Sequence, residues 1–143
     1  VFWYSIPNGQ RSALLAHKIL FIMNMLISTG KIMFALGFAA FGILHLMNAE
    51  MMAGIVPPFI PGGVIWVYIT GLAFLAAAIA IVTGKQMKLA GILLALELAI
   101  FVLTIHLPLI LSGDMMAMGS LLKDSMLAGA ALIIAGLAGE KKA

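Results

Sequence analysis

The chain contains no cysteine. Disulfide bonds, thiolate metal sites, iron–sulfur clusters and thiol redox chemistry carried by this chain alone are therefore excluded. Charged residues are also scarce, at 9% of 143 positions, against about 25% in soluble domains. The sequence has no basic run dense enough for nucleic-acid binding, no phosphate-cradling glycine loop and no metalloprotease helix motif.

Apolar residues, by contrast, make up 64% of the chain. A membrane-spanning helix needs roughly 20 mainly apolar residues. The length therefore accommodates four such helices with short connections and leaves no room for a sizeable soluble domain. We predict an all-α membrane protein in which a bundle of four transmembrane helices is surrounded by a lipid bilayer.

The N-terminal region is the least regular part of this pattern. Residues 19–27 are almost all apolar, but Lys18 and Lys31 flank a stretch too short to cross a bilayer at about 1.5 Å per residue. We expect a short interfacial or docking helix within residues 1–30, separate from a four-helix domain at residues 31–143. An alternative joins it to the first span as one long helix, which the cost of burying Lys31 disfavours.

The four spans are expected at residues 32–47, 64–82, 89–107 and 121–137. Between the first two, the run IVPPFIPGG carries Pro57, Pro58 and Pro61, followed by Gly62. Proline cannot donate a backbone hydrogen bond and disfavours a helical residue before it, so we predict a stiff loop.

Small residues recur at four-residue spacing on two of the expected spans. Ala73 and Ala77 lie in the second, and Ala131 and Ala135 lie in the fourth. This spacing favours close approach between helices.

The basic residues predict the orientation, since cytoplasmic connections carry most of the Lys and Arg of membrane proteins. With four spans, seven of the eight basic residues fall on one side, and Lys123 falls on the other. The seven are Arg11, Lys18, Lys31, Lys85, Lys88, Lys141 and Lys142. We predict that both termini are cytoplasmic and that the proline-rich loop lies at the outer face.

Two histidines approach that outer face. His45 lies about 21 Å along a helix from Lys31, and His106 lies about 27 Å from Lys88. Imidazole can ligate haem or metal, relay protons or hydrogen-bond a quinone carbonyl. The alternative is structural, because a histidine at a helix end often bonds a loop carbonyl.

Four further residues near this end join the candidate ligand-binding set. Trp66 and Tyr68 begin the second span at the depth where aromatic side chains meet a membrane interface. Lys123 and Asp124 open the fourth span. There an acid complements the positive helix end and a lysine can extend to the surface, so we favour a structural role for this pair.

Glu97 lies near the middle of the third span. An ionisable carboxyl group at that depth is expensive unless it is protonated, paired or facing a wet cavity, so it is a candidate functional acid. A protonated Glu97 that bonds a neighbouring helix is the alternative. Helical spacing places His106 on the opposite face and Thr104 on the same face, although Pro108 removes the donor for the Thr104 carbonyl.

The eleven methionines give only a weak metal signal. They cluster at Met51 and Met52 and at Met115, Met116 and Met118. Thioethers can bind Cu(I), but methionine more often packs or faces lipid, so we predict no metal site.

Several runs together resemble the DoxX-like membrane proteins of prokaryotes, over residues 31–139. These runs are FGILHLMNAE, VPPFIPGGVIWVYITGLAFLAAAIAIVTGK, LTIHLP and SLLKD before a small-residue helix. The matching positions are His45, Pro57, Pro58, Pro61, Gly62, Trp66, His106, Pro108, Lys123 and Asp124. The resemblance implies a four-helix bundle in the prokaryotic cytoplasmic membrane, within a superfamily named for thiosulfate:quinone oxidoreductase and terminal quinol oxidase subunits. Glu97 and residues 1–30 lie outside it.

Three functions follow as hypotheses. The first is a small subunit of a membrane redox complex that binds quinone near the outer face through His45 and His106 and needs electron-carrying partner subunits. The second is a non-catalytic scaffold that stabilises a larger membrane complex or a homo-oligomer. The third is a carrier or channel, which predicts a water-filled cavity reaching Glu97. Quinone is the favoured ligand, and haem and copper are much less favoured.

Overall fold

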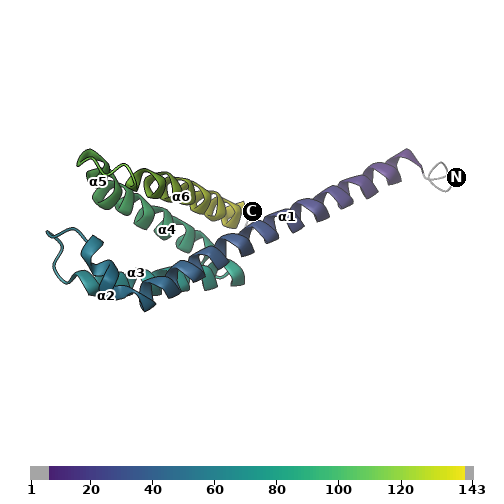
Figure 1. Ribbon diagram of the computed structural model, residues 1–143. Helices are drawn as coiled ribbons and strands as arrows, with labels where there is room; N and C mark the ends of the chain where they lie inside the picture. Colours follow the sequence, from purple (N-terminus) through teal and green to yellow (C-terminus); the bar gives the residue numbers. More distant parts are fainter. Residues whose placement is uncertain (1–6, 141–143) are drawn as a thin grey trace.

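The computed structural model describes residues 7–140, which form helices and connecting loops with no strand among them (Figure 1). The elements are α1 (Asn8–Met47), α2 (Ala49–Met52), η2 (Ala53–Ile55), α3 (Gly63–Thr83), α4 (Met87–Phe101), η3 (Val102–His106), α5 (Leu107–Leu111) and α6 (Ala117–Glu140). Lys141 and Lys142, which contributed to the predicted orientation, lie outside the described residues, as do residues 1–6.

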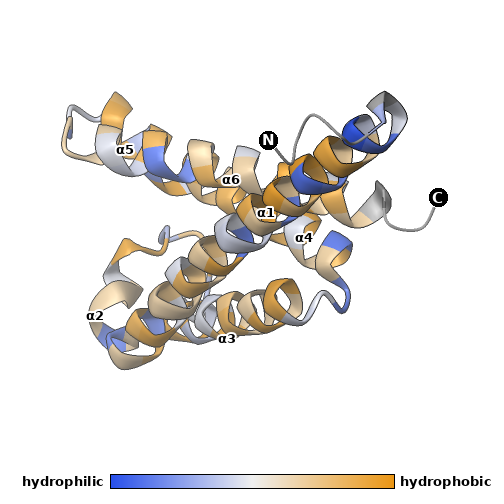
Figure 2. Cartoon of the chain, turned by 90° about the vertical axis from the view of Figure 1, so that its right-hand side faces the viewer, coloured by the Kyte–Doolittle hydropathy of each residue, from blue (hydrophilic) through white to orange (hydrophobic). Residues whose placement is uncertain are grey.

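Within residues 7–140, four helical segments are long and apolar enough to cross a membrane. They are Gly9–Met47, Gly63–Thr83, Met87–Leu111 and Ala117–Ala138. The prediction of an all-helical chain with four such segments is therefore confirmed. In Figure 2 the hydrophilic colouring falls mainly near the helix ends and along the N-terminal part of α1.

The first helix corrects the prediction for the N-terminal region. α1 is one continuous helix of 40 residues, so the separate helix expected within residues 19–27 is wrong and the alternative of one long helix holds. Ser28, Thr29 and Gly30 do not end it, since a single glycine costs a helix only about 1 kcal/mol. At about 1.5 Å per residue α1 is roughly 60 Å long, twice the thickness of a hydrocarbon core.

The helices pack as two pairs. The C-terminal half of α1 runs along α3, α6 runs along α4, and α3 contacts α4 to join the pairs. The N-terminal half of α1 extends away from the other helices (Figure 1). The core includes the buried side chains of Phe38, Phe74, Ile81 and Leu94, and the Phe38 and Phe74 rings meet edge to face at 5.1 Å between centroids.

Each pair is held close by glycine. A Cβ atom at Gly42 of α1 would lie 2.8 Å from the carbonyl oxygen of Gly71 in α3. A Cβ atom at Gly91 of α4 would lie 2.6 Å from the carbonyl oxygen of Ala131 and 3.0 Å from the Cβ of Ala135, both in α6. The small residues predicted on the fourth span thus do form a close contact, and their partner is Gly91.

The proline-rich run forms the predicted loop, over residues 56–62. The Ile60 N–H donates to the Pro57 carbonyl at 2.9 Å, which makes a turn inside the loop. Gly62 precedes α3 with a φ of 79°, a conformation that suits glycine. This loop and α5 lie at one end of the molecule, and the α3–α4 turn lies toward the other (Figure 1).

The third long segment changes its helical form near its end. Residues Val102–His106 form a π-helix, in which the Leu107 N–H bonds the Val102 carbonyl five residues back. Pro108 lacks an N–H, and its ring would clash with the Thr104 carbonyl in a regular α-helix. The wider π turn accommodates this proline.

Candidate functional site

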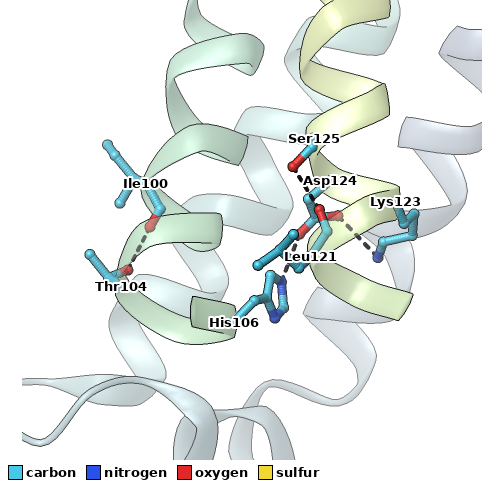
Figure 3. A network of polar contacts seen from close by, with 7 residues as sticks. All are labelled: Ile100, Thr104, His106, Leu121, Lys123, Asp124 and Ser125. Atoms are coloured by element: carbon cyan, nitrogen blue, oxygen red, sulfur yellow. Dashed lines mark hydrogen bonds and ion pairs between the residues drawn. The ribbon is translucent and has the colours of Figure 1, made fainter. Parts of the chain in front are cut away.

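Asp124 is the centre of a polar cluster that joins α6 to the end of the third long segment (Figure 3). Its Oδ2 lies 2.8 Å from His106 Nε2, and its Oδ1 lies 3.2 Å from Lys123 Nζ. Asp124 is only 4% exposed. The His106 imidazole and the Lys123 ammonium group compensate the free-energy cost of burying this carboxylate.

This geometry corrects the reading of Asp124 as a helix-end acid. α6 begins at Ala117, seven residues before Asp124, so the carboxylate lies beyond the first turn, where the helix dipole acts. Sequence reasoning paired Asp124 with its neighbour Lys123 but missed its bond to His106, which is 18 positions away.

Lys123 links the cluster to a third helix. Its Nζ lies 4.8 Å from the centroid of the Phe41 ring in α1, within cation–π range. The Lys123 side chain is half-exposed. The cluster therefore connects α1, the third segment and α6 at the end of the molecule that carries the proline-rich loop.

His45 and His106 line one small cavity of about 100 Å³. Lys123 and Asp124 line it as well, together with aromatic side chains that include Phe41. The two histidines therefore border one space, although their predicted position at an outer membrane face remains a prediction. The cavity is smaller than the roughly 300–1,000 Å³ typical of small-molecule sites, and His106 is already engaged by Asp124.

His45 is oriented by its own helix. Its Nδ1 lies 2.8 Å from the Phe41 carbonyl oxygen one turn earlier. A carbonyl oxygen can only accept, so Nδ1 carries the hydrogen and, in the neutral ring, Nε2 is left as an acceptor. The ring also meets Phe74 edge to face at 5.2 Å between centroids.

A larger groove of about 510 Å³ lies among α3, α4 and the proline-rich loop. Its lining is mostly apolar, with a few polar or aromatic side chains that converge on it. Those side chains are His45, Trp66, Thr70, Glu97, Phe101 and Thr104. We call this space the α3–α4 groove.

Glu97 and Thr104 both line the α3–α4 groove, as their shared helix face predicted. His106 lines the small cavity instead, so Glu97 and His106 belong to different spaces, also as predicted. Thr70 of α3 lines the same groove as Glu97. Sequence reasoning missed Thr70, although it is the one threonine in the predicted span at residues 64–82.

Glu97 also borders a second space of about 240 Å³ between α3 and α4. Ala73 and Ala77 line it, so this small-residue ridge borders a cavity, whereas close helix contact was expected there. The alanine side chains on this face of α3 are small, and they leave space beside Glu97.

The two aromatic candidates of α3, Trp66 and Tyr68, lie on different sides of the helix. Trp66 lines the α3–α4 groove, and its indole N–H donates to the Pro61 carbonyl at 3.0 Å, which fixes the proline-rich loop against α3. Tyr68 is 43% exposed and lies about 200° further round the helix, away from the groove. Pro57 lines the groove, whereas Pro58, Pro61 and Gly62 are exposed.

Within residues 7–140, the side chains of His, Asp and Glu form no group of three that could hold a metal ion. The Asp124 cluster, His45 and Glu97 are the predicted site residues that border the three spaces described above. Their roles as ligand-binding residues remain predictions.

Comparison with known proteins gives one assignment. No curated protein and no solved structure matches the chain. These comparisons do not link it to the DoxX-like proteins, so that resemblance also remains a prediction. A family model described as a domain of unknown function, DUF8561, matches residues 34–136, more than two thirds of the chain. The match covers His45, Glu97, His106 and Asp124, and the chain belongs to the DUF8561 family.

Proposed function

We propose that this protein is a small integral membrane subunit of a redox complex that binds a quinone-type molecule in the α3–α4 groove. The observation that carries the proposal is the groove itself. Its volume of about 510 Å³ falls within the usual range for small-molecule sites, and an apolar lining with a few convergent polar groups suits a lipophilic ring.

The same geometry favours His45 over His106 as the imidazole that contacts the ligand. His45 lines the α3–α4 groove, whereas His106 lines only the small cavity and bonds Asp124. His106 then acts structurally, by holding the third segment against α6.

The setting we propose is a prokaryotic cytoplasmic membrane, with both termini on the cytoplasmic side. The DoxX-like resemblance and the distribution of basic residues support it. Because the chain has no cysteine, electrons would be carried by other subunits of the complex. The cavities that reach Glu97 are lined mainly by apolar side chains, which favours a lipophilic occupant over the hydrated path of a carrier or channel.

The test is a binding titration with decylubiquinone, a short-tailed quinone, on the full chain in mild detergent. Trp66 lines the groove, so its fluorescence should be quenched by the bound quinone, and a Trp3→Phe background removes the other tryptophan. We expect saturable quenching, and we expect His45→Asn to weaken affinity about tenfold, because the smaller side chain removes the imidazole ring surface that borders the groove.

The matched control is Tyr68→Phe, which changes an aromatic residue of the same helix that lies away from the groove. It should leave the affinity unchanged. Saturable quenching that His45→Asn does not weaken would remove His45 from the site, and an absence of saturable quenching would reject the quinone proposal.

A second candidate, a non-catalytic scaffold, is favoured by the N-terminal half of α1. This half extends beyond the other helices, and its apolar side chains, among them Leu15, Leu20 and Leu26, are exposed. Such a surface suits contact with another membrane subunit. The titration separates the candidates, because a scaffold without a ligand site gives no saturable quenching.

A further inference from the structure

Glu97 lies where two spaces between α3 and α4 meet. It borders the α3–α4 groove, which extends to the proline-rich loop, and the space of about 240 Å³, which extends to Gln86 at the α3–α4 turn. Leu96 and Ile100 line the groove and are exposed, so the groove opens at the surface of the molecule. A molecule that enters the groove from that surface therefore reaches the Glu97 carboxyl group.

The charge of these two spaces is unbalanced. In the part of the chain that the structure describes, no lysine or arginine lines either of them, and His45 is the one other titratable side chain on their walls. An ionised carboxylate without a partner is costly among apolar side chains in a membrane, so Glu97 keeps its proton while the groove is empty. The ionised form becomes favourable when a positive charge enters the groove.

We propose that the α3–α4 groove binds a lipophilic organic cation, and that Glu97 releases its proton when the cation binds. The O–H proton passes to water, and the carboxylate that remains pairs with the cation, so the charge of the site is unchanged. The rings of Trp66 and Phe101 also line the groove, and aromatic faces attract cations. This inference goes beyond the proposed function, because it depends on the charge of Glu97 and not on a quinone.

The apolar lining determines which cations fit. A metal ion or a small ammonium ion would lose hydration that apolar side chains do not replace. A large cation with apolar substituents loses little hydration and gains from burial of those substituents against the groove. The ligand class is therefore a bulky phosphonium or quaternary ammonium compound.

The first test compares two ligands by titration calorimetry on the full chain in mild detergent. The probe is tetraphenylphosphonium, and the control is tetraphenylborate, an anion of nearly the same size and shape. We expect the phosphonium to bind saturably and the borate to bind at least about tenfold more weakly, because the borate cannot pair with a carboxylate. If the phosphonium does not bind, or binds no more tightly than the borate, the inference is overturned.

The second test measures the proton. Calorimetry in buffers of different ionisation enthalpy should show about one proton released per phosphonium bound, and the affinity should rise up to about tenfold per pH unit while the empty site is protonated. Glu97→Gln should lose both effects and bind at least about tenfold more weakly, whereas Glu97→Asp should still release a proton. His45 is present in all three proteins, so the difference between them reports Glu97.

Binding without proton release would overturn the exchange, as would a folded Glu97→Gln protein that keeps the affinity and the pH dependence of the wild type. The comparison of the two ligands uses the wild-type chain, so it does not depend on how well the variants fold. The proposed function fails separately, because decylubiquinone binding is measured by a different titration and does not require Glu97 to ionise.

Discussion

At the residue scale, stability at the end of the molecule that carries the proline-rich loop depends on one carboxylate. The Asp124 carboxylate pairs with both His106 and Lys123, and the Lys123 ammonium group in turn lies over the Phe41 ring. A buried charge left without a partner is far more costly than an exposed pair that is lost. The two ends of the Asp124–Lys123 pair should therefore respond very differently to substitution.

Asp124→Ala should lower the free energy of unfolding by about 3 kcal/mol or more, because it removes the partner of a largely buried imidazole. Lys123→Ala should cost less than about 1 kcal/mol, since its ammonium group is half-exposed. Thermal unfolding in detergent, followed by circular dichroism, checks both. Equal losses in the two variants would show that the His106 bond contributes little.

At the element scale, each helix pair depends on a glycine that permits backbone contact. Gly91 of α4 faces the backbone of α6, so an added methyl group there cannot be accommodated by moving a flexible side chain. Gly129 of α6, in contrast, has no atom within 4 Å of the position that a Cβ would take. The two positions form a matched pair for the same substitution.

Gly91→Ala should destabilise the α4–α6 pair by about 1–3 kcal/mol through overpacking. Gly129→Ala should be neutral or stabilising by up to about 1 kcal/mol, because alanine is the better helix former. The midpoints of thermal unfolding of the two variants give the comparison. A Gly91→Ala protein as stable as the wild type would mean that the helices are not in backbone contact.

At the scale of the whole molecule, the connections between the long helices lie at two ends. Lys85 lies at the α3–α4 turn, whereas the proline-rich loop, α5 and the exposed Met116 lie at the other end. The absence of cysteine makes this arrangement directly testable, since any introduced thiol is the only one in the chain.

Met116→Cys should react with a membrane-impermeant maleimide added to intact cells, because the predicted orientation places it outside. Lys85→Cys should react only after the cells are permeabilised. The measurement is the mass shift of the labelled protein on a gel. The reverse pattern would invert the orientation and place the α3–α4 groove near the cytoplasmic face.

The sequence by itself determined the helical, apolar class of this protein, three of its four long helices and the proline-rich loop. It did so because hydropathy, helix length and proline chemistry are local properties of consecutive residues. It also placed Thr104 on the face of Glu97 and His106 on the other, because helical periodicity extends over that distance. The prediction for α1 was wrong, because it gave more weight to the free-energy cost of burying Lys31 than to the continuity of the helix.

Only the tertiary structure decided which groups share a space. The bond between His106 and Asp124 and the contact of Gly91 with Ala131 join residues on different helices, and Thr70 and Glu97 line one groove from two helices. Nothing in the spacing along the chain encodes such contacts, since they depend on how helices are paired and rotated against one another. The division between a small cavity at His106 and a larger groove at Glu97 follows from that packing.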